Sequence, residues 1–118
     1  MVLADTSVWV DHLYKGVTLL EEMLSEDEIL MHPVVIGELA CGSIPNRAKT
    51  FHLLGKLPTA AVSTNQEVLH LVETHKFYGC GISWGDAHIL ASALINGCAL
   101  WTHDKKLHNL AKFLGIAK

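Results

Sequence analysis

The sequence predicts an α/β fold in which helices cover a parallel sheet. Short apolar runs alternate along the chain with segments of helical periodicity, which is typical of strand–helix–strand units. The run Cys98–Trp101, for example, suits a short strand that is buried on both faces. Because 118 residues provide for one core and leave no room for a second, residues 1–118 are predicted to form a single domain.

Composition excludes several classes of protein. Half of the residues are hydrophobic and 18% are charged, which excludes intrinsic disorder. No apolar run approaches the roughly 20 residues of a membrane span, and no basic region precedes the first apolar stretch. We therefore expect a soluble, cytoplasmic protein with no membrane partner. The three cysteines lack a C-x-x-C pair, so they are predicted to be reduced thiols in or near the core rather than zinc ligands.

The N-terminal half is predicted to contain two strands and four helices. Thr18 is a candidate N-cap, Pro33 suits the first turn of a helix, and Gly42 suits a helix end. The predicted elements are a strand at Val2–Ala4, a helix from Val8 to Lys15, a helix from Thr18 to Leu24, a strand at Ile29–Met31, a helix at Val34–Cys41 and a helix at Arg47–Leu54.

The C-terminal half is organised around one apolar helix. Its core-facing stripe is formed by Ile89, Leu90, Ala93 and Leu94, and Asn96-Gly97 ends it. The other predicted elements are a strand near Ala60–Val62, a helix capped by Thr64 or Asn65 and running to about His75, the strand Cys98–Trp101, a helix from Lys105, and an edge strand at Gly115–Ala117.

Four acidic residues stand at the boundaries of these elements or close to them. Asp5 ends the first strand, Glu38 lies about one turn into a helix, Asp86 enters the apolar helix and Asp104 follows the last buried strand. Ligands bind outside the carboxyl ends of parallel strands, so all four carboxylates can converge there. With no Lys or Arg fixed in these segments, a divalent cation is the physical remedy for their repulsion.

Capping is the alternative for two of these acids. Ser83-Trp84-Gly85-Asp86 fits the S-x-x-D signal of a helix start, and Asp104 can cap a helix that begins at Lys105. Glu38 has no such explanation, because its helical neighbours are apolar or small and include no Lys or Arg. The pattern therefore leaves capping open for Asp86 and Asp104 and favours function for Glu38.

Four segments resemble, in order and spacing, the acidic motifs of PIN-domain ribonucleases, and more narrowly the VapC toxins of type II toxin–antitoxin pairs. They are ADTSVWVDHL, HPVVIGELACG, GISWGDAHILASAL and LWTHDKKL. The resemblance spans nearly the whole chain, and His103 stands where arginine is frequent in the family. It implies a PIN-like fold, a three-layer α/β/α sandwich with a short central parallel sheet.

The resemblance also implies an activity. A metal-dependent endoribonuclease of this kind would use Asp5, Glu38, Asp86 and Asp104 as catalytic residues and ligands of Mg²⁺ or Mn²⁺. Such ions lower the pKa of a bound water and stabilise charge on the attacked phosphate, so the expected reaction is hydrolysis of an RNA phosphodiester. The implied partners are RNA such as transfer RNA, a cognate antitoxin protein and a second copy of the chain in a homodimer.

Three assignments stay open on the sequence alone. A catalytically silent PIN-like binding module is the main alternative function, although all four acids are present. A phosphoryl-transfer domain is disfavoured because Asp5-Thr6-Ser7 offers no second acid after the first strand. Lys105 and Lys106 could hold the RNA backbone or simply be solvated, and all three tryptophans are expected in the core.

Overall fold

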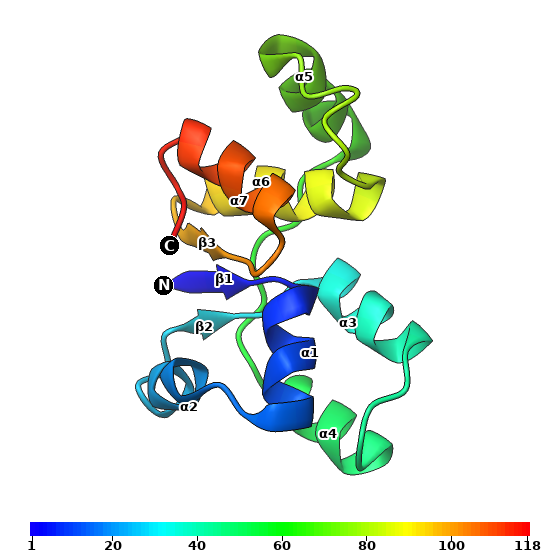
Figure 1. Cartoon of the computed structure of the whole chain (residues 1–118), viewed down its shortest axis with the longest axis vertical. Coiled ribbons are helices and arrows are strands. Elements are labelled where there is room, and N and C mark those ends of the chain that lie inside the picture. The colour runs from blue at the N-terminus through cyan, green and yellow to red at the C-terminus, as the bar shows by residue number, and fades with distance from the viewer.

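A three-stranded parallel sheet lies at the centre of the computed structural model, which describes residues 1–118 (Figure 1). Its strands are β1 (Val2–Ala4), β2 (Ile29–Leu30) and β3 (Ala99–Trp101), in the order β2-β1-β3. The middle strand β1 pairs with both neighbours, so that Ala4 lies opposite Trp101 at the carboxyl end. The first strand of the chain is thus held by the last.

Seven helices surround this sheet. They are α1 (Thr6–Lys15), α2 (Thr18–Ser25), α3 (Pro33–Cys41), α4 (Arg47–Leu54), α5 (Asn65–His75), α6 (Trp84–Asn96) and α7 (Lys105–Phe113). Helices α6 and α7 lie beside β3, whereas α1 and α2 lie toward β2, and α5 extends away from the sheet while packing on α6 (Figure 1). This is the predicted α/β/α arrangement. None of the helices combines the length and apolar character needed to cross a membrane.

The predicted core is confirmed except at Leu94, which was expected in the core-facing stripe but is 38% exposed. Leu3 of β1, Val8 of α1 and the α6 stripe residues Ile89, Leu90 and Ala93 are fully buried and belong to one hydrophobic cluster. Burial of each large aliphatic side chain of this kind contributes about 1.5–3 kcal/mol. The cluster therefore fixes α1 and α6 against the sheet, and with them the residues at their N-termini.

Most helix boundaries follow the sequence signals. Helix α4 has the predicted limits, and α5 is capped by Thr64 in a capping box with Glu67. The predicted cap Thr18 is wrong, because Val17 occupies the N-cap position of α2 and makes no side-chain cap hydrogen bond. His32 caps α3 instead of a smaller polar residue, since its Nδ1 accepts a hydrogen bond from the Val34 N–H.

The strand predicted at Ala60–Val62 is absent. Only Thr59 pairs with the sheet, through an isolated bridge to Met31. The backbone of Ala61 is instead bound by side chains of α6, because its N–H donates to Asn96 Oδ1 at 3.1 Å and its carbonyl accepts from Ser92 Oγ. Side chains of a helix thus take the hydrogen bonds that a neighbouring strand would need. The predicted edge strand at Gly115–Ala117 is likewise reduced to a bridge between Leu100 and Ala117.

Two expectations about burial are also wrong in part. Cys98 is buried as predicted, but Cys41 and Cys80 are exposed. Trp9 and Trp101 are buried, whereas Trp84 is 48% exposed at the first position of α6. Its indole ring contacts the imidazole of His88 edge-on, with ring centroids 4.6 Å apart. The apolar residues around Trp84 in the sequence predicted that it is buried, but α6 turns this side chain toward solvent.

Candidate active site

Asp5 is the buried member of the acidic group. It follows β1 and caps α1, and its side chain is 4% exposed. Its Oδ1 accepts hydrogen bonds from the N–H groups of Ser7 and Val8 and from Ser7 Oγ. Burial raises the pKa of the Asp5 carboxyl above its ordinary value, although these hydrogen bonds and one from Thr102 oppose the shift. The hydrogen bonds therefore hold the Asp5 carboxylate in place but do not fully offset the cost of burying its charge.

Thr102 connects Asp5 with Asp104. It lies just beyond β3 and is buried, and its Oγ1 donates to Asp5 Oδ2 at 2.7 Å while accepting from the Asp104 N–H at 3.0 Å. Asp104 then caps α7, because its Oδ1 accepts from the N–H of Lys106 at 2.9 Å and of Leu107 at 3.4 Å. The carboxyl ends of β1 and β3 thus place two of the predicted acids on opposite sides of one threonine.

Glu38 reaches the same edge of the molecule from α3. Its Oε1 accepts a hydrogen bond of 2.5 Å from Thr6 Oγ1, the residue next to Asp5. Its Oε2 lies against α6, since a Cβ atom built on Gly85 would be 3.3 Å from that oxygen. Glu38 therefore lies between the start of α1 and the start of α6, which carries Asp86.

Asp86 has the capping role that the sequence allows. Its Oδ2 accepts from the Ser83 N–H at 3.0 Å, and its own N–H donates to Ser83 Oγ at 3.1 Å. The side chain is half-buried in the first turn of α6. All three aspartates thus serve as helix caps or capping-box partners, and only Glu38 lies inside a helix without such a role.

The four acids share one edge, but they are not drawn tightly together. No three His, Cys, Asp or Glu side chains lie close enough to hold a metal ion between them. Capping uses only one oxygen of Asp86 and of Asp104, and the Thr6 hydroxyl uses only one oxygen of Glu38. Glu38 Oε2, Asp86 Oδ1 and Asp104 Oδ2 therefore accept no hydrogen bond from the protein. Oxygens of this type suit Mg²⁺ and Mn²⁺.

No Lys, Arg or His side chain forms an ion pair with the four acids. The two ion pairs of the structure join Asp11 to Lys15 and to His103, and neither involves the four acids. Carboxylate oxygens that have no cation of their own are the kind of ligand that a divalent metal ion prefers.

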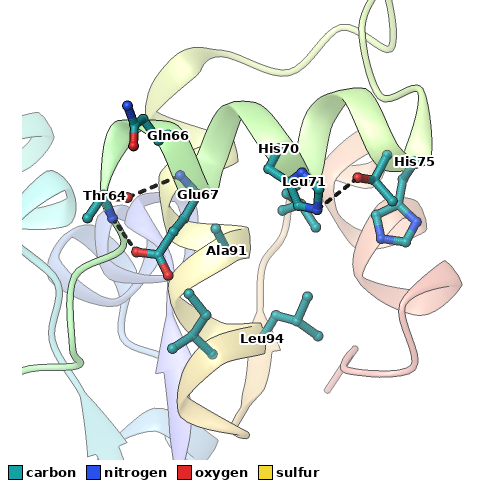
Figure 2. Close-up of a pocket in the computed structure, with 10 residues that line it drawn as sticks. Thr64, Gln66, Glu67, His70, Leu71, His75, Ala91 and Leu94 are labelled. Carbon is teal, nitrogen blue, oxygen red and sulfur yellow. Dashed lines mark hydrogen bonds between the residues drawn. The ribbon is translucent and has the colours of Figure 1, made fainter.

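The largest pocket lies elsewhere. It occupies about 460 Å³ between α5 and α6, where Leu71 and Ala91 form part of an apolar floor beneath Glu67 and His70 (Figure 2). Glu67 is turned back onto the Thr64 N–H in the capping box of α5 (Figure 2). None of the four predicted acids lines this pocket. Its shape therefore has no direct part in the chemistry of the acidic edge.

Comparison with known families decides what the acidic edge belongs to. The model of the PIN domain matches residues 2–113, which is nearly the whole chain. The chain is a PIN-domain protein. The matched region begins with β1 and ends with α7, so it includes all four predicted acids.

Curated relatives and solved structures agree with this assignment. The PIN domain is 44% identical over 118 residues to Ribonuclease VapC32 from two strains of Mycobacterium tuberculosis, a match that covers 99% of this chain and 95% of the relative. It is therefore related to VapC-type proteins along its full length. Its fold is similar to the crystal structures of FitAcB from Neisseria gonorrhoeae and of PAE2754 from Pyrobaculum aerophilum.

The two structural matches are extensive despite low identity. FitAcB matches with a TM-score of 0.67 at 20% identity, covering 95% of this chain and 94% of the other. PAE2754 matches with a TM-score of 0.61 at 18% identity, covering 97% and 88%. These likenesses confirm the predicted PIN-like fold.

Sequence reasoning missed the residues that position the acids of this PIN domain. Ser7 and Thr102 were not singled out, yet Ser7 Oγ donates to Asp5 and also accepts the His103 N–H at 2.9 Å. The signal was present in the hydroxyl residues that follow each strand, Thr6-Ser7 after β1 and Thr102 after β3. Short hydroxyl side chains at strand ends can bond to a carboxylate from the neighbouring strand.

Proposed function

We propose that this PIN domain is a metal-dependent endoribonuclease that acts as the toxin of a toxin–antitoxin pair. The observation that carries the proposal is an edge with four carboxylates that make no ion pair, in a chain 44% identical to a protein named as a ribonuclease. The proposed ligands and catalytic residues are Asp5, Glu38, Asp86 and Asp104. The proposed cofactor is Mg²⁺ or Mn²⁺, and residues 1–118 would act as one domain.

Asp5 and Glu38 would have different roles in the reaction. Asp5, held by Ser7 and Thr102, provides a fixed oxygen at the bottom of the site. Glu38 is exposed, and the Thr6 hydroxyl orients its carboxylate, which suits it to accept a proton from an attacking water. A bound Mg²⁺ or Mn²⁺ would supply Lewis-acid stabilisation of the attacked phosphate and lower the pKa of a water.

Purified protein incubated with pooled cellular RNA tests this function. We expect discrete RNA fragments in the presence of Mg²⁺ or Mn²⁺ and none after addition of a chelator, because the acidic edge repels phosphate unless a cation is bound. Cleavage that persists in chelator would contradict metal dependence, and its absence under all conditions would contradict the nuclease assignment.

A catalytically silent binding module is the second candidate. One observation favours it: the three aspartates have capping roles that would explain their presence without catalysis. The same RNA assay separates the two functions, because a silent module yields no fragments with either metal. Binding of RNA without cleavage would support the module.

We also propose a cognate antitoxin and a second copy of the chain as partners. Exposed apolar side chains support this, including Leu94 and Ile95 beside the pocket of Figure 2, and Leu53 beside a second apolar groove next to α1 and α2. Large contiguous apolar patches are rare on the surface of monomeric proteins and usually mark interaction sites. Light scattering of the free protein, and co-purification with the product of a neighbouring small open reading frame, test the two partners.

Gly85→Ala is expected to lower RNA cleavage by about three- to tenfold with little change in thermal stability. The added Cβ would lie 3.1 Å from Val34 Cγ1 and 3.3 Å from Glu38 Oε2, so the Glu38 carboxylate must shift. Small misplacements of catalytic groups reduce rates by up to about a hundredfold, whereas alanine gains about 1 kcal/mol over glycine in helices.

Gly37→Ala in α3 is the matched control for this prediction. A Cβ there meets nothing within 4 Å, so it should raise the melting temperature and leave cleavage unchanged. Equal cleavage by Gly85→Ala and Gly37→Ala would show that the position of Glu38 does not matter for the reaction.

A further inference from the structure

Lys106 lies between the two helix starts that carry Asp86 and Asp104. Its N–H is bound by Asp104 Oδ1 at 2.9 Å in the first turn of α7. Its side chain then crosses to the turn before α6, where a Cβ atom built on Gly81 would lie 2.9 Å from both Cδ and Nζ of the lysine. Gly81 is two residues before Ser83, which caps α6 and bonds to Asp86. The lysine therefore spans the rim of the acidic edge.

This ammonium group has no carboxylate of its own. Neither ion pair of the structure includes Lys106, and Asp104 directs Oδ1 to backbone N–H groups rather than to the lysine side chain. The surrounding edge is negative and repels the phosphates of RNA, so an unpaired cation at its rim is in the place where a phosphate needs one.

We propose that Lys106 binds a backbone phosphate of the RNA next to the four-carboxylate site. The proposal rests on the ribonuclease function proposed above and assigns that site a positioning residue for its substrate. Gly81 has a matching role, because any side chain at this position would occupy the space of the lysine stem. Lys105, the preceding residue in α7, is exposed and makes no side-chain hydrogen bond or ion pair, so it provides the matched control.

Lys106→Ala should raise KM for cleavage of pooled transfer RNA by about fivefold or more at low salt, with kcat changed less than about twofold. Losing one phosphate contact should also reduce the slope of log(kcat/KM) against log[KCl] by about 0.7 to 1. Lys105→Ala should leave KM, kcat and the slope unchanged.

A pair of glycine variants tests the same contact from the other side. Gly81 and Gly79 both have positive φ, at +81° and +71°, so alanine strains the backbone at both. Only a Cβ at Gly81 meets Lys106, whereas one at Gly79 meets nothing within 4 Å. We expect Gly81→Ala to raise KM by less than Lys106→Ala does, because the lysine is displaced but keeps its charge, and Gly79→Ala to affect only the melting temperature. The double variant Gly81→Ala/Lys106→Ala should have the KM of Lys106→Ala alone.

Filter binding of pooled transfer RNA in an Asp5→Asn background separates this inference from the proposed function. Wild-type cleavage combined with equal KM and salt slope for Lys106→Ala and Lys105→Ala overturns the inference and leaves the function standing. Weaker RNA binding by Lys106→Ala without any cleavage by the wild type supports the phosphate contact and overturns the nuclease. A fall in kcat and melting temperature at an unchanged salt slope assigns Lys106 a structural role and overturns the inference. Absence of both binding and cleavage by the wild type overturns both.

Discussion

Asp5→Asn, Glu38→Gln, Asp86→Asn and Asp104→Asn are each expected to reduce RNA cleavage by at least about tenfold. Each substitution exchanges a carboxylate for an amide of the same shape, which weakens the binding of a divalent cation. The fold should survive, because asparagine caps helices about as well as aspartate and the acceptor oxygen that binds the backbone is retained. Initial rates of RNA cleavage in saturating Mn²⁺, together with thermal melts, measure the two effects.

Glu67→Gln is the matched control for Asp86→Asn. Glu67 has the same place in the capping box of α5 as Asp86 has in that of α6, but it lines the pocket of Figure 2 rather than the acidic edge. If capping alone explains Asp86, both variants should keep wild-type activity and lose similar stability. Any one of the four amide variants that cleaves RNA at the wild-type rate removes its residue from the site.

The metal-free Asp5→Asn variant should melt at a higher temperature than the wild type at neutral pH. The pKa of the Asp5 carboxyl is raised by burial, so the folded state binds that proton more tightly than the unfolded chain. The contribution of the Asp5 carboxyl to the free energy of unfolding is fully present below its unfolded pKa of about 3.9. This contribution is lost as pH rises through the raised pKa of the folded state. Asparagine removes this loss while keeping the acceptor for Ser7 and Val8, and Thr102 can turn toward Ser7 Oγ, 3.3 Å away.

Melts of both proteins at pH 4 and pH 7.5, with chelator and with Mn²⁺, measure this effect. The advantage of Asp5→Asn should be larger at pH 7.5, with each kcal/mol worth roughly 4 °C in a chain of this size. Metal should reverse the order, because a ligand at a hundredfold excess over its dissociation constant stabilises the wild type by about 2.7 kcal/mol. Asp104→Asn is the control, since its exposed carboxylate has little charge burial to relieve. A wild type that is the more stable protein in chelator at pH 7.5 would contradict the prediction.

Much of the fold could be predicted because local signals and packing agree. The stripe along α6, the caps at Thr64 and Ser83, and the end of α6 at Gly97 all operate within a few residues of the chain. Where the outcome depended on distant residues, the sequence was insufficient. Ala61 has the surroundings of a strand in sequence, but hydrogen bonds from Ser92 and Asn96 replace the sheet.

The same division applies to the candidate site. Asp5, Asp86 and Asp104 could be named from their positions at strand ends and helix starts, and Glu38 from its apolar helical neighbours. The resemblance supplied their proposed role. Their connections could not be named, because Thr102 and Asp5 are 97 residues apart and Thr6 and Glu38 are 32 residues apart. The path of the Lys106 side chain over Gly81 depends on the packing of α7 beside α6, which no local pattern encodes.

The central position of β1 determines when an active molecule can first exist. β1 leaves the ribosome well before its partner β3, and the Thr102 that holds Asp5 follows Asp5 by 97 residues. Contacts of such long sequence separation form late and slowly. A nascent chain of this protein therefore carries all the residues of α1 and α3 long before it has a completed acidic edge. For the nuclease proposed above, synthesis itself therefore delays activity until Thr102 and Asp104 have left the ribosome and joined Asp5.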